Sequence, residues 1–280
     1  MTDNYITNAM SVDVEDYFQV AAFDDHITRQ EWHKFPLRVE KNTYKILELF
    51  AKHNIKATFF MLGWVAERFP GLLQDIVAQG HELASHGYAH KRATLQTRSE
   101  FREDISKAKQ ILEEISSTDI KGYRAPSYSI NHSNMWVHDE LYDTGHIYSS
   151  SVYPVKHDLY GIPDAPRFKY TLDNGLIEIP ISTIKIINKN LPAGGGGFFR
   201  FYPYMLSKWI IKNINKNDQQ PAIFYFHPWE LDPEQPRQEN ASLKSKFRHY
   251  LNLHKTEKRL CQLLTDIEWD RMDKVFEIET

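Results

Sequence analysis

Segments with strand-like and helix-like residue patterns alternate along most of this chain, and that alternation constrains its fold more than any other feature. Residues 6–14 form an apolar run that ends in carboxylates, and residues 56–62 are rich in Thr and Phe, as β-strands are. Further strand patterns lie at 82–85, 122–125, 176–181 and 222–226, and helical patterns at 37–53, 64–79, 99–116, 134–144 and 204–214. The alternation predicts an α/β fold of parallel strands joined by crossover helices.

The size of the chain fits one large domain with an extension. With 280 residues, of which 41% are hydrophobic, it can build the core of a single α/β barrel. Residues 232–240 are rich in Pro, Gln and charge and indicate a linker, residues 243–267 have a helical pattern, and residues 275–278 indicate a closing strand. We therefore predict one domain over residues 1–232 and a C-terminal helical extension, residues 233–280, packed on it.

Several classes of protein are disfavoured. A formal net charge of -3 argues against a nucleic-acid partner, because such proteins usually have a basic surface. The first residues lack a basic segment followed by an apolar one, and no apolar run approaches the roughly 18 residues of a membrane span, so we expect a cytoplasmic protein with no such span. The single cysteine, Cys261, excludes an internal disulfide framework and is expected to be packed. The sequence leaves the oligomeric state open.

Polar side chains stand at four predicted strand ends, where an ordinary core would not place them. In parallel α/β folds the carboxyl ends of the strands meet at one edge, and functional groups gather there. We therefore expect these side chains to form one site: Asp13, Glu15 and Asp16; His86 and His90; Arg124; and His227.

His86 and His90 lie four residues apart in the run HGYAH. A helix would place both on one face, and a tight loop, which Gly87 favours, would also bring them together. Neutral imidazoles suit Zn²⁺ and similar divalent ions, whereas two unrelated surface histidines are the alternative interpretation. The protease motif HExxH is excluded, because the candidate that starts at His81 has Ser85 in the place of its second histidine.

Asp13 and Glu15 are two residues apart, so in a continuing strand their side chains leave the same face. One carboxylate would complete a two-histidine, one-carboxylate metal site, and the other would accept a proton from water. We prefer Glu15 as the ligand and Asp13 as the base, with Asp16 as the alternative ligand. A solvated acidic loop is the alternative to any site here.

Arg124 and His227 could assist such a reaction. Arg124 would hold a neighbouring carboxylate ionised and oriented, although a structural ion pair is an equal alternative. His227 follows an apolar strand, stands near Trp229, and could protonate a leaving amine; a satisfied core histidine is the alternative.

In their order along the chain, these four segments resemble the motifs of the polysaccharide deacetylase family (carbohydrate esterase family 4, the NodB-homology domain), over about residues 8–230. The runs DVEDYF and HGYAH, with the segment PDAPRF and the glycine-rich segment, are similar to a bacterial subgroup associated with exopolysaccharide or surface-glycan gene clusters. The chain departs from the family pattern in three places. Its acidic motif is spread over Asp13, Glu15 and Asp16, Gly87 follows the first histidine, and no Asp-Trp motif is recognisable to orient His227.

The resemblance implies a distorted (β/α) barrel with a metal at its C-terminal mouth. The implied activity is metal-dependent removal of N-acetyl groups from an amino sugar of a polysaccharide or surface-glycan precursor. The implied cofactor is one divalent ion, with Zn²⁺ preferred over Co²⁺, Ni²⁺ or Fe²⁺, and its ligands would be Glu15, His86 and His90. Asp13 would act as the base, His227 as the acid and Arg124 as the partner of Asp13.

Substrate-binding residues follow less directly from the resemblance. Tyr153, Trp229 and Arg167 are expected to line the sugar groove, and the backbone N–H of Tyr153 is expected to bind the oxyanion. Residues 194–197, four glycines, indicate a flexible linker, with a close approach of sugar to backbone as the alternative.

Two other functions stay open at this point. One is a related hydrolase of C–N bonds in a small cyclic amide or imide, which only the shape of the groove would distinguish. The other is a non-catalytic glycan-binding relative, which the loss of the acid or the base would favour; Asp13 and His227 are both present.

Overall fold

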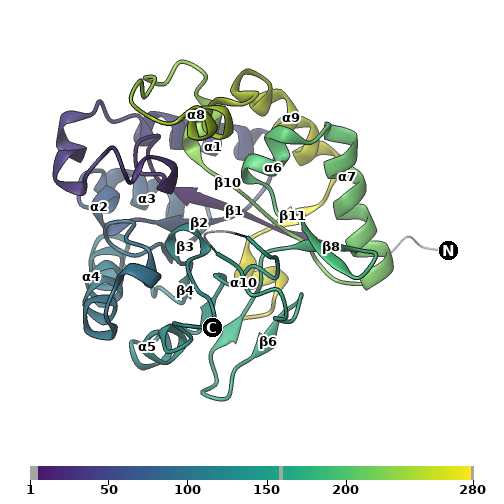
Figure 1. The fold of residues 1–280 in the computed structure, drawn as a ribbon, viewed down its shortest axis with the longest axis horizontal. Coiled ribbons are helices and arrows are strands. Elements are labelled where there is room, and N and C mark those ends of the chain that lie inside the picture. The colour runs from purple at the N-terminus through teal and green to yellow at the C-terminus, as the bar shows by residue number, and fades with distance from the viewer. Residues whose placement is uncertain (1–5, 158–159, 279–280) are drawn as a thin grey trace.

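The computed structural model describes residues 6–157 and 160–278, and at its centre lies a mixed, mainly parallel sheet of nine strands (Figure 1). The strand order is β10-β1-β2-β3-β4-β5-β7-β6, with β11 paired to β1 beside this path and β6 antiparallel to β7. The strands are β1 (Asn8–Val14), β2 (Thr58–Met61), β3 (Glu82–Ser85), β4 (Gly122–Tyr123), β5 (Tyr148–Ser149), β6 (Tyr170–Thr171), β7 (Ile177–Glu178), β10 (Ile223–Phe226) and β11 (Trp269–Asp270).

The sheet curls so that the chain after β7 meets β10. The Ser182 hydroxyl accepts a hydrogen bond from the Ile223 N–H, and Gly195 forms a parallel bridge with Tyr225. The result is a distorted (β/α) barrel, and the predicted fold class is confirmed. The expectation that the first residues form no leader concerns residues 1–5 in part, and these lie outside the described residues.

Most helices cover the outside of the sheet, whereas the short helix α10 (Met272–Val275) reaches the inside of the barrel through Met272 (Figure 1). They are α1 (Val39–His53), α2 (Gly63–Ala66), α3 (Pro70–Ala78), α4 (Arg98–Ser116), α5 (Val137–Asp143), α6 (Gly196–Phe201), α7 (Tyr204–Asn213), α8 (Leu243–Tyr250), α9 (Leu253–Asp266) and α10 (Met272–Val275). A separate hairpin joins β8 (Thr183–Ile186) to β9 (Lys189–Pro192). Among the residues that the structure describes, no helix has the length and apolar character of a membrane span.

The alternation of side chains along β1 separates two cores. Met10, Val12 and Val14 belong to the large apolar cluster between sheet and helices. Ala9 belongs to a smaller cluster inside the barrel, and Asp13 has the same parity. The inward direction of Asp13 therefore follows from the strand itself.

Two sequence-based predictions of secondary structure are wrong. Residues 64–79 form two helices rather than one, because Pro70 starts α3 and its ring disfavours helical geometry at Phe69. The closing strand is β11, which pairs with Asn8 and Ala9, whereas Val275 ends α10.

The segment expected to be a linker, residues 232–240, is tied to the fold. Gln235 is buried, donates to the carbonyl oxygens of Trp229 and Asp232, and accepts a hydrogen bond at Oε1 from Nε2 of His249 at 2.6 Å. Asp232 forms an ion pair with Arg38. The division of the chain after residue 232 stays a prediction.

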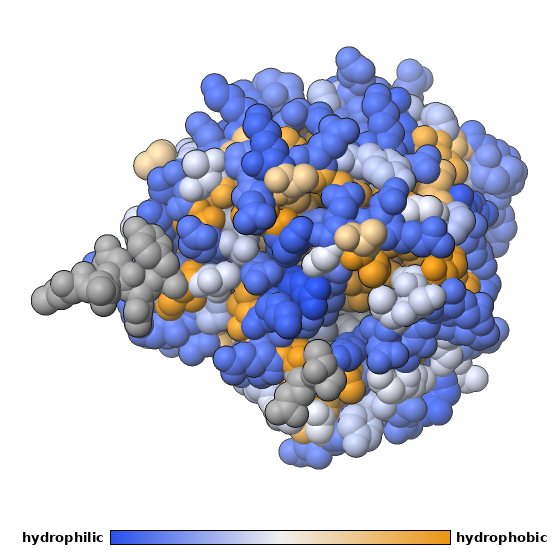
Figure 2. Space-filling model, turned by 180° about the vertical axis from the view of Figure 1, so that it is seen from behind, coloured by the Kyte–Doolittle hydropathy of each residue, from blue (hydrophilic) through white to orange (hydrophobic). Residues whose placement is uncertain are grey.

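The glycine-rich segment is also fixed rather than flexible. A Cβ on Gly195 would lie 2.2 Å from the Tyr225 carbonyl oxygen, and Gly195 has a φ of 118° that other residues rarely adopt. Gly194 and Gly196 are buried beside it. The prediction of a linker at residues 194–197 is therefore wrong, because these glycines allow the chain to pack directly on β10. Figure 2 shows the molecule from behind as a mainly hydrophilic surface with smaller hydrophobic areas.

Candidate active site

A cavity of about 190 Å³ opens at the carboxyl ends of β1, β3 and β10. Six of the predicted site residues line it: Asp13, Glu15, His86, His90, His227 and Trp229. Its other lining residues are Val20, Ala21, Ser127, Tyr128, Tyr160 and Tyr225. Residues more than 200 positions apart in the sequence thus meet in one space.

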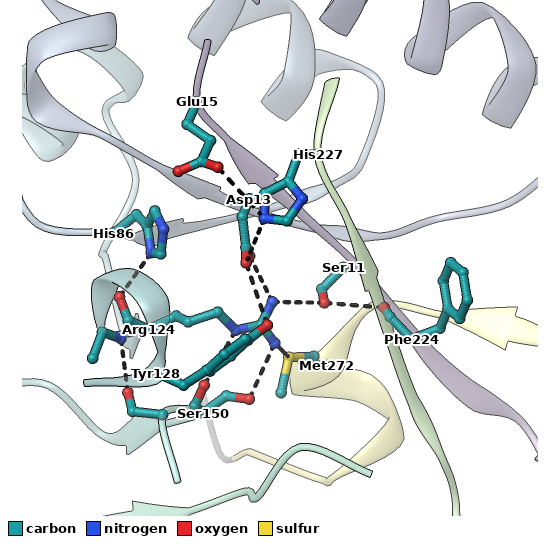
Figure 3. A network of polar contacts seen from close by, with 12 residues as sticks. Ser11, Asp13, Glu15, His86, Arg124, Tyr128, Ser150, Phe224, His227 and Met272 are labelled. Carbon is teal, nitrogen blue, oxygen red and sulfur yellow. Dashed lines mark hydrogen bonds and ion pairs between the residues drawn. The ribbon is translucent and has the colours of Figure 1, made fainter. Parts of the chain in front are cut away.

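Glu15, His86 and His90 form a group that could hold a metal ion, with one ligand atom from each lying within 4.8 Å of the others. All three side chains are buried. The Nε2 of His90 lies 2.7 Å from the Oε2 of Glu15, yet that oxygen has no hydrogen-bond partner among the described residues. The Nδ1 of His86 is 2.8 Å from the Arg124 carbonyl oxygen and donates to it, which leaves Nε2 free to bind an ion (Figure 3).

The charges of these groups suit a cation. Burial opposes ionisation of Glu15, but His90 and His227 outweigh it and lower its pKa to about 2. Burial lowers the pKa of His86 to about 4, although Asp13 acts in the opposite direction. An ionised carboxylate beside a neutral imidazole is the state in which both groups donate electron pairs to a metal.

Asp16, the alternative ligand, is occupied elsewhere. Its Oδ2 accepts hydrogen bonds from the N–H groups of Arg38 and Val39 at 2.7 and 3.0 Å, at the start of α1. Its Oδ1 accepts from the N–H of Tyr17 at 2.9 Å. Asp16 therefore stabilises the N-terminus of α1, and the geometry favours Glu15 as the ligand.

Asp13 is held by Arg124 inside the barrel. The Nη1 of Arg124 lies 2.6 Å from Oδ1 of Asp13, and both side chains are buried. The Tyr128 hydroxyl donates to Oδ2 at 3.4 Å. The guanidinium has further partners in the barrel interior (Figure 3): the hydroxyl of Ser11, the carbonyl and hydroxyl oxygens of Ser150, and the sulfur of Met272.

His227 faces Asp13 and Glu15 across the cavity. Its Nε2 is 3.9 Å from Oδ2 of Asp13 and 3.6 Å from Oε1 of Glu15 (Figure 3). Burial lowers the pKa of His227, but Glu15, Glu230 and Asp13 outweigh it and raise the pKa to about 9. His227 can therefore carry a proton at the edge of the cavity.

His227 is held in place by two residues, Glu230 and Arg200, that were not predicted from the sequence. The Nδ1 of His227 is 2.7 Å from Oε1 of Glu230, and Oε2 of Glu230 is 2.5 Å from Nε of Arg200. Glu230 could have been found, because it stands three residues after His227 in a short turn. Arg200, on α6, gives no local signal. Glu230 therefore occupies the orienting role that no Asp-Trp motif supplies here.

The structure does not bring Arg167 or the Tyr153 ring to the cavity wall. Arg167 forms a bidentate ion pair with Asp218, both contacts 2.9 Å, and donates to the Thr183 carbonyl oxygen. The Tyr153 ring is buried and stacks on Tyr160, with 5.7 Å between ring centroids. Trp229 does line the cavity, where its indole N–H donates to Glu15 at 3.2 Å.

Two family models match the chain. The model described as polysaccharide deacetylase matches residues 19–142, and one described as a domain of unknown function (DUF3473) matches residues 150–277. Residues 19–142 thus resemble a polysaccharide deacetylase domain. The second model spans both the His227 segment and the C-terminal helices.

Curated relatives agree over short stretches. A peptidoglycan-N-acetylglucosamine deacetylase of Bacillus cereus is 38% identical over 84 residues, which is 30% of this chain and 30% of the relative. A peptidoglycan deacetylase of Helicobacter pylori is 30% identical over 82 residues, 29% of this chain and 28% of the relative. The chain thus spans less than a third of the length of these relatives.

Solved structures share the fold over almost the whole chain. A Mycobacterium smegmatis protein assigned to the polysaccharide deacetylases has a TM-score of 0.60 at 18% identity and covers 99% of this chain and 91% of its own. PuuE allantoinase has a TM-score of 0.59 at 14% identity, with 97% and 89% covered. At these identities the likeness concerns the fold.

Proposed function

We propose that this chain is a metal-dependent N-deacetylase that acts on an N-acetylated amino sugar of a polysaccharide or surface-glycan precursor, with Zn²⁺ as the preferred ion. One observation carries the proposal. Asp13, held by Arg124, and His227, held by Glu230, face each other across the cavity that also contains Glu15, His86 and His90. A base, an acid and a metal-ligand set are the groups that amide hydrolysis requires.

Glu15, His86 and His90 would hold the ion, which, when bound, lowers the pKa of water and polarises the acetamide carbonyl. Asp13 accepts the proton of the attacking water. Arg124 keeps Asp13 ionised, because the opposite charge stabilises the carboxylate. This division gives the two carboxylates of the motif separate tasks.

His227 then protonates the departing sugar nitrogen through Nε2, because its Nδ1 is engaged with Glu230. For the oxyanion we favour the backbone N–H of Ser127 over that of Tyr153. Ser127 lines the cavity with a φ of 55°, and its N–H has no hydrogen-bond partner within residues 6–157 and 160–278. A free donor at the cavity wall suits a developing negative charge.

The test is an acetate-release screen on N-acetylated oligosaccharides and on nucleotide- and lipid-linked N-acetyl sugars, with and without added Zn²⁺. A small cyclic imide is assayed in parallel for the alternative hydrolase. We expect Zn²⁺-dependent acetate release from at least one sugar and none from Asp13→Asn protein. Ring opening of the imide without acetate release would contradict the proposal, and sugar binding without turnover would favour the binding relative.

A further inference from the structure

An exposed face on α6, α7 and the β8–β9 hairpin combines apolar side chains with lysines. We propose that this face, called here the lysine-rich face, binds the surface of a membrane that contains anionic lipids. Three features of the face support this: its charge, its exposed apolar side chains and the strained tip of the hairpin.

The charge of this region is opposite to that of the whole chain. Residues 179–217 contain no Asp or Glu and six basic residues, although the formal net charge of the chain is -3. Four of the six are exposed and form no ion pair with a described residue: Lys185, Lys189, Lys212 and Lys216. A cluster of unpaired lysines attracts anionic headgroups.

Apolar side chains project from the same helices. Phe201 and Met205 are 60% and 68% exposed, and Trp209 is 49% exposed. Met205 and Trp209 are four residues apart and Lys212 follows three residues later, so all three share one side of α7. Trp at a polar boundary with lysines beside it is typical of surfaces that lie in the membrane interface.

The tip of the β8–β9 hairpin adds an independent sign of function. Ile187 is 92% exposed and has a φ of 45°, a left-handed conformation that a β-branched residue rarely adopts. Gly or Asn would form this turn with less strain and no exposed apolar surface. Ile187 thus costs free energy both through its strained backbone and through its exposed apolar side chain. Both costs would be offset if the side chain inserts into the apolar part of a membrane.

The hairpin and α7 lie at the same edge of the molecule (Figure 1). Arg167 joins them, because it contacts both Thr183 at the base of β8 and Asp218 after α7. Asn215 is hydrogen-bonded to Asn8, where β1 begins, whereas Asp13 lies five residues along that strand. At about 3.3 Å per residue the end of α7 is therefore roughly 17 Å from Asp13 in the cavity wall, whereas α6 lies nearer, because its Arg200 binds Glu230.

A second copy of the chain is a less suitable occupant. A twofold interface uses the same patch on both subunits, so it would place the lysines of one copy against those of the other. An anionic lipid surface accepts both the lysines and the apolar side chains.

The test is flotation of the full chain with vesicles of phosphatidylcholine alone or with 30% phosphatidylglycerol as the chosen probe, at low and high salt. We expect binding to the anionic vesicles only, weakened by salt. Lys212→Glu with Lys216→Glu should lower the partition coefficient on the order of tenfold or more, since each lysine contributes. Lys41→Glu with Lys255→Glu, the same charge change on exposed positions elsewhere, should leave binding far less affected.

The apolar contribution is tested with Trp209→Ser and Ile187→Asn, against Leu95→Ser as a control on another exposed apolar residue. Both variants should reduce binding several-fold, and acetate release from a soluble substrate should stay unchanged. Failure of wild-type protein to bind anionic vesicles at low salt would overturn the proposal. The proposal would also be overturned if the wild-type protein bound no vesicles but formed a concentration-dependent dimer that Trp209→Ser dissociates. That result would show that the face binds a second copy of the chain.

Discussion

Two of the histidine–glutamate pairs in this barrel, His227 with Glu230 and His138 with Glu178, lie in different surroundings. In the first pair Arg200 binds the glutamate, and the free Nε2 of the histidine faces the carboxylates of the cavity. In the second pair Glu178 accepts the N–H groups of Ser151 and Val152, both at 2.8 Å.

The second histidine has no comparable task. His138 Nε2 lies 3.3 Å from Glu178, and its Nδ1 has no hydrogen-bond partner among the described residues. Neither residue lines the cavity. The comparison teaches that the two pairs differ in the second imidazole nitrogen: that of His227 reaches the carboxylates of the cavity, as an acid would need, whereas Glu178 beside His138 holds the backbone of Ser151 and Val152.

The largest effect should come from removing the metal ligands. His86→Ala with His90→Ala should lose the bound ion completely, because only Glu15 of the group remains. His138→Ala should keep the full metal content, since His138 lies outside that group. Metal analysis of purified protein measures both. Full metal content in the double variant would show that the ion binds elsewhere.

Asp13→Asn should reduce turnover by about 10²–10⁴ while the protein still binds metal, because loss of a general base typically costs that much. The measurement is kcat with bound metal quantified in the same preparation. Near wild-type turnover with the metal in place would exclude Asp13 as the base.

Glu230→Gln should reduce kcat by roughly 10–10², as removal of an orienting partner does. Activity requires protonated His227, so it falls as pH rises through the pKa of that residue. Because Glu230 helps to raise this pKa, its replacement should move the alkaline limb to lower pH. Glu178→Gln is the matched control and should leave the pH–rate profile in place. An identical shift in both variants would point to a general loss of structure.

The smallest effect is one of stability. Several contacts lower the pKa of Glu178 although burial raises it, so ionised Glu178 stabilises the folded state at pH values above its unfolded pKa and less as pH falls. Glu178→Gln should therefore lower the free energy of unfolding by about 1–3 kcal/mol near pH 7, and the gap to wild type should narrow below about pH 4.5. Denaturant unfolding at several pH values measures this difference in the free energy of unfolding. A difference that does not change with pH would indicate lost packing alone.

Sequence reasoning succeeded where a local pattern determines geometry. Asp13 points into the barrel because strand residues alternate, and Arg124 meets it because both stand at ends of parallel strands. It failed where the role of a residue depends on a partner that is distant in the sequence. The carboxylates of Glu15 and Asp16 are chemically alike, and only the position of α1 after residue 38 assigns Asp16 to capping.

Other errors arose from interpreting composition as flexibility. The four glycines at residues 194–197 would be mobile in isolation, but Tyr225 on β10 requires the small size of Gly195 and Gly196. Arg167, in the segment PDAPRF, was expected near the sugar, whereas Asp218, far along the chain, binds it. Such partners depend on tertiary packing, which no local pattern contains.

The position of β1 between β10 and β11 has a consequence for the way the protein is made. β1 precedes its neighbours on that side, residues 223–226 and 269–270, by more than 200 positions in the sequence, and Met272, which touches Arg124, follows β11. During synthesis β1 must therefore stay paired with β2 alone until the segments with β10 and β11 have left the ribosome. Asp13 and His227 can face each other only after that, so the proposed site is assembled long after its first residues have been made.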